Sequence, residues 1–486
     1  MTKQSSLFLT IVITLLAFGL RARDLGAASL WNDEGSTAFT IRQSWPEMVD
    51  RLWEDAVHPP LFFAAEKLLA GLGDSEFALR LPAVFFGVAS VAAVARLGRE
   101  WINGRAGLLA ALFLAVSPFI VWYSREARMY SLLALLSIGV MAGFGRLLFS
   151  SPLRRALPAF AAISAVLYLT HYFALFLPLT QFAYLLVTFR QNHERLRRWA
   201  LAQGLAALPI GLWIAGQYRH GVTLKIAWIP SPQWETLWLT FGRFINGTVP
   251  GWQFGVAVAI AVAGFGMYQL RLRQQSLLLA LWWLLPPVLT FAISFRRPLY
   301  VDRYFIGSLC AFALALAAGV ELIRRRTPWV GNALAALLVG LMGWQTLSTP
   351  NTFGEDWRGA AQYVTAHSRS GDILLSRSIF YWAFDYYYHG DLSLQAMDGD
   401  SQVEPPLQGR LWFVYRLESG GAASDKELLL QDLYRNAPDL ERLEWLKAAE
   451  PYLAEWHDFE NVTVLLYDFS LDTSLTQDSY ETTYLR

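Results

Sequence analysis

The sequence has little charge and almost no cysteine. Only 16% of its 486 residues are Asp, Glu, Lys or Arg, whereas soluble domains average about 25%. The net charge of +1 excludes a global basic field for nucleic acid. The one cysteine, Cys310, forms no internal disulfide, and we find no CxxC pair, Walker loop or Ser-His-Asp set. Chemistry in this chain would therefore use carboxylates, histidines and arginines.

Long hydrophobic runs take the place of charge. Hydrophobic residues make up 55% of the chain, and a helix needs about 20 mostly apolar residues to span a bilayer. Ala27–Ser29 would suit a signal cleavage site, but the many later runs favour an uncleaved first anchor. We therefore predict a polytopic α-helical membrane protein with about eleven spans, near residues 6–22, 81–98, 106–123, 131–149, 157–170, 172–189, 199–216, 253–270, 277–295, 304–323 and 329–347.

The fifth and sixth of these runs are the hardest to separate. Only His171 and Tyr172 lie between them. Residues 157–189 therefore fit either two spans or one re-entrant hairpin.

Arginines in the short loops predict the orientation, because basic loops face the cytoplasm. With the N-terminus inside, the outer side holds residues 23–80, 217–252 and everything after about 348. We expect a multi-pass protein of the cell (plasma or inner) membrane with its C-terminal region outside. Every inner loop is then basic, carrying Arg96, Arg99 and Arg105; Arg154 and Arg155; Arg190, Arg195, Arg197 and Arg198; Arg271 and Arg273; and Arg324, Arg325 and Arg326.

Five arginines oppose this rule. Arg125 and Arg128 fall in the second outer loop, and Arg296, Arg297 and Arg303 in the fifth. One interpretation is that they snorkel to lipid headgroups. The other is that they hold an anionic ligand at the outer face, for which phosphate fits best because the guanidinium fork matches its oxygens.

An acidic pair follows the first span, in Trp31–Thr37. Asp33 and Glu34 fit the N-cap and first turn of a helix starting near Ser36. That explains one carboxylate better than two. A carboxylate at this interface could also take a proton from an incoming hydroxyl, or hold a divalent cation such as Mg²⁺ or Mn²⁺.

The rest of residues 23–80 predicts helices lying in the membrane surface. Trp45 opens a short amphipathic stretch, and the run after Pro60 as far as Leu72 is too short to span. His58 precedes Pro59, which holds it extended. His58 either ends that extended segment or belongs to a site.

Three other groups carry the same choice between structure and function. Arg128 and Tyr130 follow Glu126, which could pair locally with Arg125. His171 and Tyr172, at an outer turn, fit an interfacial aromatic belt equally well. Arg303 has a neighbouring acid, Asp302, which would suit an ion pair at a helix end.

The composition changes after Pro350. A polar helix is expected from Glu355 to about His367, and an aromatic helix over 380–389. Short buried strands are expected at 372–375, 411–415 and 462–467, with a charged helix near 426–435. This alternation predicts a small soluble α/β domain over 350–486, following a membrane domain over 1–349.

Several stretches, taken in order, carry a resemblance. They are Trp31-Asn32-Asp33-Glu34, His58-Pro59-Pro60-Leu61, Leu79-Arg80-Leu81-Pro82, Ser117-Pro118-Phe119 and Ser124-Arg125-Glu126-Ala127-Arg128-Met129-Tyr130. The ordered set resembles the GT-C fold glycosyltransferases that use polyprenyl-phosphate sugars, closest to family 39 and the RgtA/B/C/D-like group, relatives of protein O-mannosyltransferases. The resemblance covers roughly residues 1–350.

This resemblance implies roles for individual residues. Asp33 would be the catalytic base with Glu34 beside it, and His58 would frame the same cavity. The donor phosphate would be bound by Arg128, Arg303, Arg125 and Tyr130, and His171 and Tyr172 would be further site residues. A hexose or pentose would move, with inversion, from a polyprenyl-phosphate donor to a lipid, glycan or protein acceptor. The resemblance leaves metal dependence open.

Two other classes of function fit parts of the pattern. A flippase or transporter of lipid-linked sugars would place charges near mid-bilayer on paired half-helices, whereas these charges gather at one face. A non-catalytic subunit of glycan assembly would have no need of the acid pair.

Overall fold

The computed structural model describes residues 2–149, 153–221, 229–245, 252–270, 274–349, 354–377, 381–397, 408–416, 426–436 and 444–470. The chain forms two compact units. The first comprises Met1–Leu25 and Gln43–Pro350, and the second comprises Gly26–Arg42 and Asn351–Arg486.

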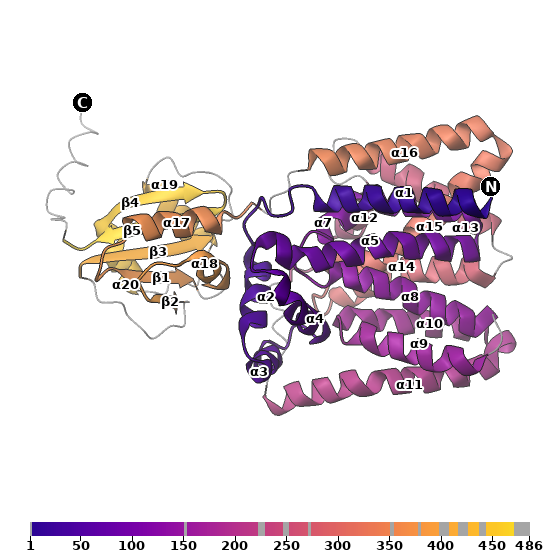
Figure 1. Ribbon diagram of the computed structural model, residues 1–486, viewed down its shortest axis with the longest axis horizontal. Coiled ribbons are helices and arrows are strands. Elements are labelled where there is room, and N and C mark those ends of the chain that lie inside the picture. The colour runs from indigo at the N-terminus through magenta and orange to yellow at the C-terminus, as the bar shows by residue number, and fades with distance from the viewer. Residues whose placement is uncertain are drawn as a thin grey trace. The chain divides into compact units, whose positions relative to one another are not determined.

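The first unit is built from helices (Figure 1). Helix α5 packs against α1, α6 and α8, and α15 packs against α6, α13, α14 and α16. Their bounds are α1 Lys3–Ala22, α3 Trp45–Asp55, α4 Leu61–Leu69, α5 Glu76–Trp101, α6 Gly104–Val116, α7 Pro118–Tyr123, α8 Tyr130–Phe149, α9 Leu153–Tyr168, α10 Phe176–Val187, α11 Phe189–Arg219, α12 Trp234–Ile245, α13 Trp252–Gln269, α14 Gln274–Ser294, α15 Ile306–Arg326 and α16 Pro328–Ser348, with 3-10 turns η1 Ala70–Leu72, η2 Tyr172–Leu175 and η3 Asp302–Phe305.

The predicted polytopic helical architecture is confirmed. Among the described residues, seven helices are long and apolar enough to cross a membrane, and three more are apolar but shorter. Each predicted run coincides with a helix or a pair of consecutive helices. Residues 157–189 hold two separate helices, α9 and α10, joined through η2. The number of helices that cross the membrane stays a prediction, and Arg271 and Arg273 lie outside the described residues.

Helix α3 begins at Trp45, where the sequence predicts that an amphipathic stretch opens. Helix α3 starts with a capping box, in which the Ser44 hydroxyl accepts the Glu47 amide and the Glu47 carboxylate accepts the Ser44 amide. These two hydrogen bonds give acceptors to two backbone amides that have no acceptor within the helix. The helix ends at Ala56, whose φ of 52° turns the chain toward His58.

A proline divides the third predicted run into α6 and α7. Pro118 has no N–H, so it cannot donate to the carbonyl four residues earlier, that of Leu114. The buried Arg21 supplies that donor instead, with Nη2 3.1 Å from the Leu114 oxygen and Nη1 3.1 Å from the Ala115 oxygen. The Thr346 hydroxyl donates to the next carbonyl, that of Val116, at 2.8 Å. The break thus persists without leaving these carbonyls unsatisfied.

Within its described residues, the second unit contains a five-stranded mixed sheet, as the α/β prediction requires. The strand order is β2-β1-β3-β5-β4; β1 pairs in parallel with β2 and β3, whereas β5 pairs antiparallel with β3 and β4. The bounds are α2 Asn32–Arg42, α17 Trp357–His367, β1 Ile373–Arg377, α18 Tyr381–Tyr387, β2 Leu394–Met397, β3 Arg410–Arg416, α19 Lys426–Asn436, α20 Glu444–Ala449, η6 Glu450–Tyr452, β4 Leu453–Phe459 and β5 Val462–Asp468.

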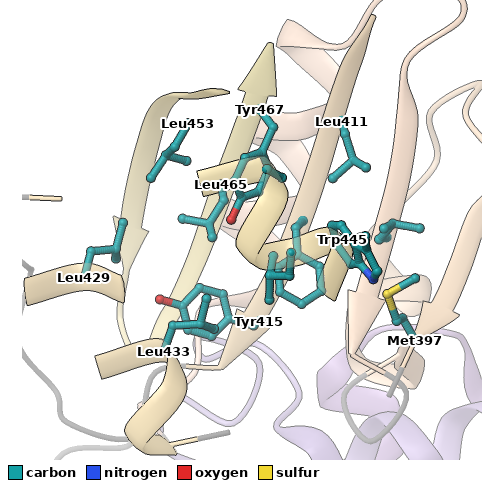
Figure 2. Packing of buried hydrophobic residues seen from close by; sticks show 13 residues of the cluster. Met397, Leu411, Tyr415, Leu429, Leu433, Trp445, Leu453, Leu465 and Tyr467 are labelled. Atoms are coloured by element: carbon teal, nitrogen blue, oxygen red, sulfur yellow. The ribbon is translucent and has the colours of Figure 1, made fainter. Parts of the chain in front are cut away.

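The sheet has an apolar core on each face. Leu411, Phe413 and Tyr415 of β3 pack with α19 and α20 (Figure 2). The alternate residues Trp412 and Val414 pack with α17 and α18. Successive side chains of a strand point to opposite faces, so β3, buried on both sides, reads as an unbroken hydrophobic run.

The sequence missed the two edge strands, β2 and β4. Strand β2 has four residues, and its central pair is exposed. Strand β4 has one buried residue, Leu453, and changes register between Leu453 and Glu455. A register change breaks the two-residue alternation that identifies a half-buried strand.

Candidate functional site

Five residues predicted from sequence meet in the first unit. His58, Arg128, Tyr130, His171 and Arg303 come from segments far apart in the chain, and we call them the arginine–histidine cluster. Each lies at or just before the start of a helical segment, namely α4, α8, η2 or η3. The Leu61 amide donates to the Leu169 carbonyl at 3.0 Å, which ties the segment of His58 to that of His171.

Arg128 and His58 are in direct contact. Arg128 Nη2 lies 2.8 Å from His58 Nε2, and the Arg128 side chain is buried, with 3% of it exposed. That burial excludes snorkelling to a lipid headgroup. On the other side of the imidazole, Asp55 Oδ2 lies 3.8 Å from His58 Nδ1. Burial raises the pKa of the Asp55 carboxyl, but its hydrogen bond and charge interaction with His58 outweigh this, and the pKa is lowered.

His171 is buried and held in one orientation. Its Nδ1 accepts the Phe173 amide at 3.1 Å, so the ring caps η2 and this nitrogen carries no proton. Its ring centroid lies 4.6 Å from that of Tyr304 and 6.4 Å from that of His58. Burial lowers the pKa of His171 well below its usual value, and the charges of His58, Arg128 and Arg303 lower it further.

Arg303 faces aromatic rings of the same cluster. Its guanidinium carbon lies 5.7 Å from the Tyr130 ring centroid and 5.9 Å from that of Tyr304, within the range of cation–π attraction. The neighbouring carboxylate of Asp302 forms an ion pair with Arg243 and accepts the Arg303 amide at 2.7 Å. Tyr304 was absent from the predicted site, although it belongs to the stretch that indicated Arg303.

The cluster therefore concentrates positive charge in a largely buried setting. Arg128 and Arg303 are charged at any physiological pH, and both act on His171 electrostatically. Two guanidinium groups among histidine and tyrosine side chains suit an anion with several oxygens, such as a phosphate.

Two predicted site residues have other neighbours. The Arg125 Nη2 donates to the Arg23 carbonyl at 2.7 Å. Burial and the charge of Arg80 lower the pKa of Arg125, to about 10. The Tyr172 hydroxyl donates to Gln217 Oε1 at 2.7 Å. The two remaining out-of-rule arginines, Arg296 and Arg297, are exposed at the end of α14, which is compatible with headgroup contact.

The acidic pair lies in the second unit. Helix α2 begins at Asn32, one turn before the start predicted at Ser36, so Asp33 and Glu34 both lie in its first turn. That place is favourable for carboxylates because the helix dipole is positive there. Glu34 is buried and its Oε2 accepts the Trp31 amide at 3.4 Å. Asp33 is half-buried, and its backbone carbonyl accepts the Thr37 hydroxyl.

Asp33 and Glu34 are the acids that the sequence offers as ligands for a divalent cation. Within the described residues, no group of three or more His, Cys, Asp or Glu side chains is placed to hold a metal ion. Asp33 and Glu34 offer two carboxylates, and the Glu34 carboxylate accepts the Trp31 amide. Mg²⁺ is commonly held by one or two carboxylates together with substrate phosphates, so a divalent cation at this pair stays a prediction.

Comparison with known families gives one match. Residues 57–214 match the family model of dolichyl-phosphate-mannose-protein mannosyltransferases. This range contains His58, Arg128 and His171 of the cluster. No curated protein sequence matches the chain.

Solved structures match nearly the whole chain. ArnT from Cupriavidus metallidurans bound to undecaprenyl phosphate has a TM-score of 0.60 at 14% identity, covering 96% of this chain and 98% of that one; its apo form gives 0.62 at 15% with the same coverage. The archaeal oligosaccharyltransferase AglB from Archaeoglobus fulgidus, in complex with an inhibitory peptide and a dolichol-phosphate, gives 0.57 at 11%, covering 95% and 74%. The resemblance predicted from the motifs is thus confirmed at the level of the fold: the chain is a polytopic membrane protein of the GT-C fold with a small C-terminal sheet domain.

Proposed function

We propose that the protein transfers a sugar from a polyprenyl-phosphate donor to an acceptor hydroxyl at the outer face of the membrane. The observation that carries this proposal is the arginine–histidine cluster, which offers a largely buried, positively charged site within a helical membrane unit. The match of residues 57–214 to a lipid-phosphate-dependent mannosyltransferase family supports it.

The donor phosphate would be bound by Arg128 and Arg303. A guanidinium can make two parallel hydrogen bonds to phosphate oxygens. His58, 2.8 Å from Arg128, would orient that guanidinium. Tyr130 and Tyr304 would contribute aromatic faces beside Arg303. As the donor bond breaks, negative charge grows on the phosphate, and these fixed cations would stabilise it.

The transfer itself is a displacement at the anomeric carbon. The acceptor oxygen forms the new glycosidic bond, while the bond from C1 to the phosphate oxygen breaks and the lipid phosphate leaves with the electron pair. We assign the proton of the acceptor hydroxyl to the Asp33 carboxylate, with Glu34 as its neighbour. Attack opposite the leaving group inverts the anomeric centre.

The proposed orientation places the N-terminus in the cytoplasm and residues 350–486 outside. The arginines of the inner loops support it. All five members of the cluster then belong to outer loops or to the outer ends of helices. The donor would be a hexosyl or pentosyl polyprenyl phosphate, and the acceptor a lipid, glycan or protein hydroxyl.

A transfer assay tests the proposal. Purified protein in detergent would be given radiolabelled undecaprenyl-phosphate hexoses and pentoses with envelope lipid, glycan and protein acceptors. We expect transfer with one donor. Asp33→Asn should lower the rate about 100-fold or more, because a general base contributes about 10²–10⁴.

The matched control is Asp50→Asn, the same change at an exposed position of α3, and it should keep the wild-type rate. Full activity of Asp33→Asn would refute the base assignment. Absence of transfer from every donor, with the lipid phosphates bound normally, would refute the proposed reaction.

A further inference from the structure

Helix α2, which carries Asp33 and Glu34, is part of the second unit although it lies near the N-terminus. It packs against α18. The two helices touch at Gly35, where an added Cβ would lie 2.5 Å from the Ala383 Cα and 2.7 Å from its nitrogen. No side chain fits there without separating the helices, so glycine sets this close approach.

The start of α2 is held by Glu355. This carboxylate is buried, with 5% of the residue exposed. Its Oε2 accepts the Asn32 amide at 3.0 Å and the Trp357 indole N–H at 2.8 Å, while Oε1 lies 2.9 Å from Arg416 Nε. One carboxylate therefore joins the first residue of α2 to α17 and to the end of β3.

Further contacts fix the residues on either side of Asn32. The Leu30 amide donates to the Tyr387 hydroxyl at 2.6 Å, and the Ser29 hydroxyl donates to the Glu355 carbonyl. At the other end of α2, the Arg42 guanidinium lies 4.5 Å from the Tyr386 ring centroid. The residues before α2, its first residue and its last residue thus all contact residues more than 300 positions away in the sequence. These contacts fix the helix that carries the acid pair.

We propose that the C-terminal part of the second unit, Asn351–Arg486, serves to position helix α2, which carries the acid pair. Glu355 is the main positioning residue. This proposal rests on the function proposed above, because it assigns Asp33 to the reaction. A general base must lie within about 2.6–3.2 Å of the proton it accepts. Asp33 directly follows Asn32, so the bond from Asn32 to Glu355 controls where that carboxylate lies.

The arginine–histidine cluster lies entirely in the first unit, whereas Glu355 belongs to the second. A change at Glu355 can therefore be tested for its effect on transfer separately from donor binding. Glu355→Ala removes both acceptor oxygens, whereas Glu355→Gln keeps one and loses the charge that pairs with Arg416. We expect transfer to fall about 10-fold or more in Glu355→Ala, since a charged hydrogen-bonding group contributes about one to two powers of ten. Glu355→Gln should fall between it and wild type.

Two other readouts separate positioning from general loss of structure. Binding of undecaprenyl phosphate should be unchanged, so kcat should fall while the KM for donor stays within a factor of about two. Hydrogen exchange measured on the full chain should accelerate at residues 32–42 and stay as in wild type in β3 and β5.

The chain offers matched controls. Glu455→Gln makes the same change at an exposed site of β4, and it should behave as wild type. Leu446→Ala opens a cavity in the opposite core of the same unit, and it should lower the melting temperature without changing kcat at temperatures where the protein stays folded.

A second variant acts on α2 independently of Glu355. Gly35→Ala should separate α2 from α18 and lower kcat while donor binding persists. Gly19→Ala, where nothing lies within 4 Å of the added Cβ, is its control. Unchanged kcat and unchanged exchange at residues 32–42 in both Glu355→Ala and Gly35→Ala would overturn the proposal.

The outcome also distinguishes this proposal from the function itself. If wild type transfers sugar and these variants do so equally well, only the positioning role fails. If wild type transfers nothing while exchange at residues 32–42 still accelerates in the variants, the second unit holds α2 and the proposed function fails.

Discussion

Two sets of arginines in the first unit have contrasting partners. In the first set, each guanidinium donates to backbone carbonyls. Arg21 donates to Leu114 and Ala115. Arg80 donates to Leu25, and Arg125 donates to Arg23. Arg128 and Arg303 lie instead against a histidine and against tyrosine rings. An arginine that donates to backbone carbonyls stabilises the fold, and a guanidinium is also the side chain that best matches phosphate oxygens. We therefore propose that the first set has a structural role and that the second set binds the phosphate.

The largest expected effect is on donor binding. Arg128→Ala should weaken binding of undecaprenyl phosphate by about 10–100-fold, because a hydrogen bond to a charged group contributes about 1.5–3 kcal/mol. Arg125→Ala, three residues away and bound to the Arg23 carbonyl, should bind the lipid as wild type does. Fluorescence or calorimetric titration in detergent measures both. Equal losses in the two variants would remove the distinction between the two sets.

An intermediate effect is expected on stability. Arg21→Met should leave the Leu114 and Ala115 carbonyls without their guanidinium donor, and Pro118 has no N–H to take its place. The free energy of unfolding should fall by about 1–3 kcal/mol. The thermal midpoint in detergent should fall, while lipid binding at low temperature persists. A melting temperature equal to that of wild type would show that the carbonyls find another donor.

The smallest effect concerns pH. Burial lowers the pKa of His171 well below its usual value, with His58, Arg128 and Arg303 adding to the shift. The folded protein therefore keeps His171 neutral at a pH where the unfolded chain, with a pKa near 6.5, takes up a proton. Stability should fall as the pH drops below about 6.5, by at most about 1.4 kcal/mol per pH unit from this group.

His171→Asn removes that group and should flatten the decline between pH 7 and pH 5. Chemical denaturation at fixed detergent concentration, run in parallel on both proteins, gives the difference in slope. Parallel slopes would show that His171 is protonated in the folded state.

The sequence indicated the two arginines of the arginine–histidine cluster because they violate a topology rule. In the predicted orientation, Arg128 and Arg303 fall on the side of the membrane where arginine is disfavoured, so each was expected to have a partner. Arg21 lies at the predicted outer end of the first span, but no nearby residue indicates which groups it contacts. Its role follows only from the position of Pro118 next to it in space, which no local pattern contains.

The assignment of α2 to the second unit was beyond the reach of the sequence. It depends on the fit of Gly35 to Ala383 and on the bond from Asn32 to Glu355, both between residues more than 300 positions apart. Helix starts and buried strands follow from nearby residues, as at Ser44 and in β3. An edge strand such as β4 is defined by its hydrogen bonds to the neighbouring strand and not by a pattern in its own sequence. The sequence therefore did not predict it.

The most direct test is a structure of the protein with undecaprenyl phosphate, determined by cryo-electron microscopy. The account predicts that the phosphate lies within hydrogen-bond distance of the Arg128 and Arg303 guanidinium groups. A phosphate bound by Arg80 and Arg125 instead, with Arg128 still against His58 and away from the lipid, would contradict it.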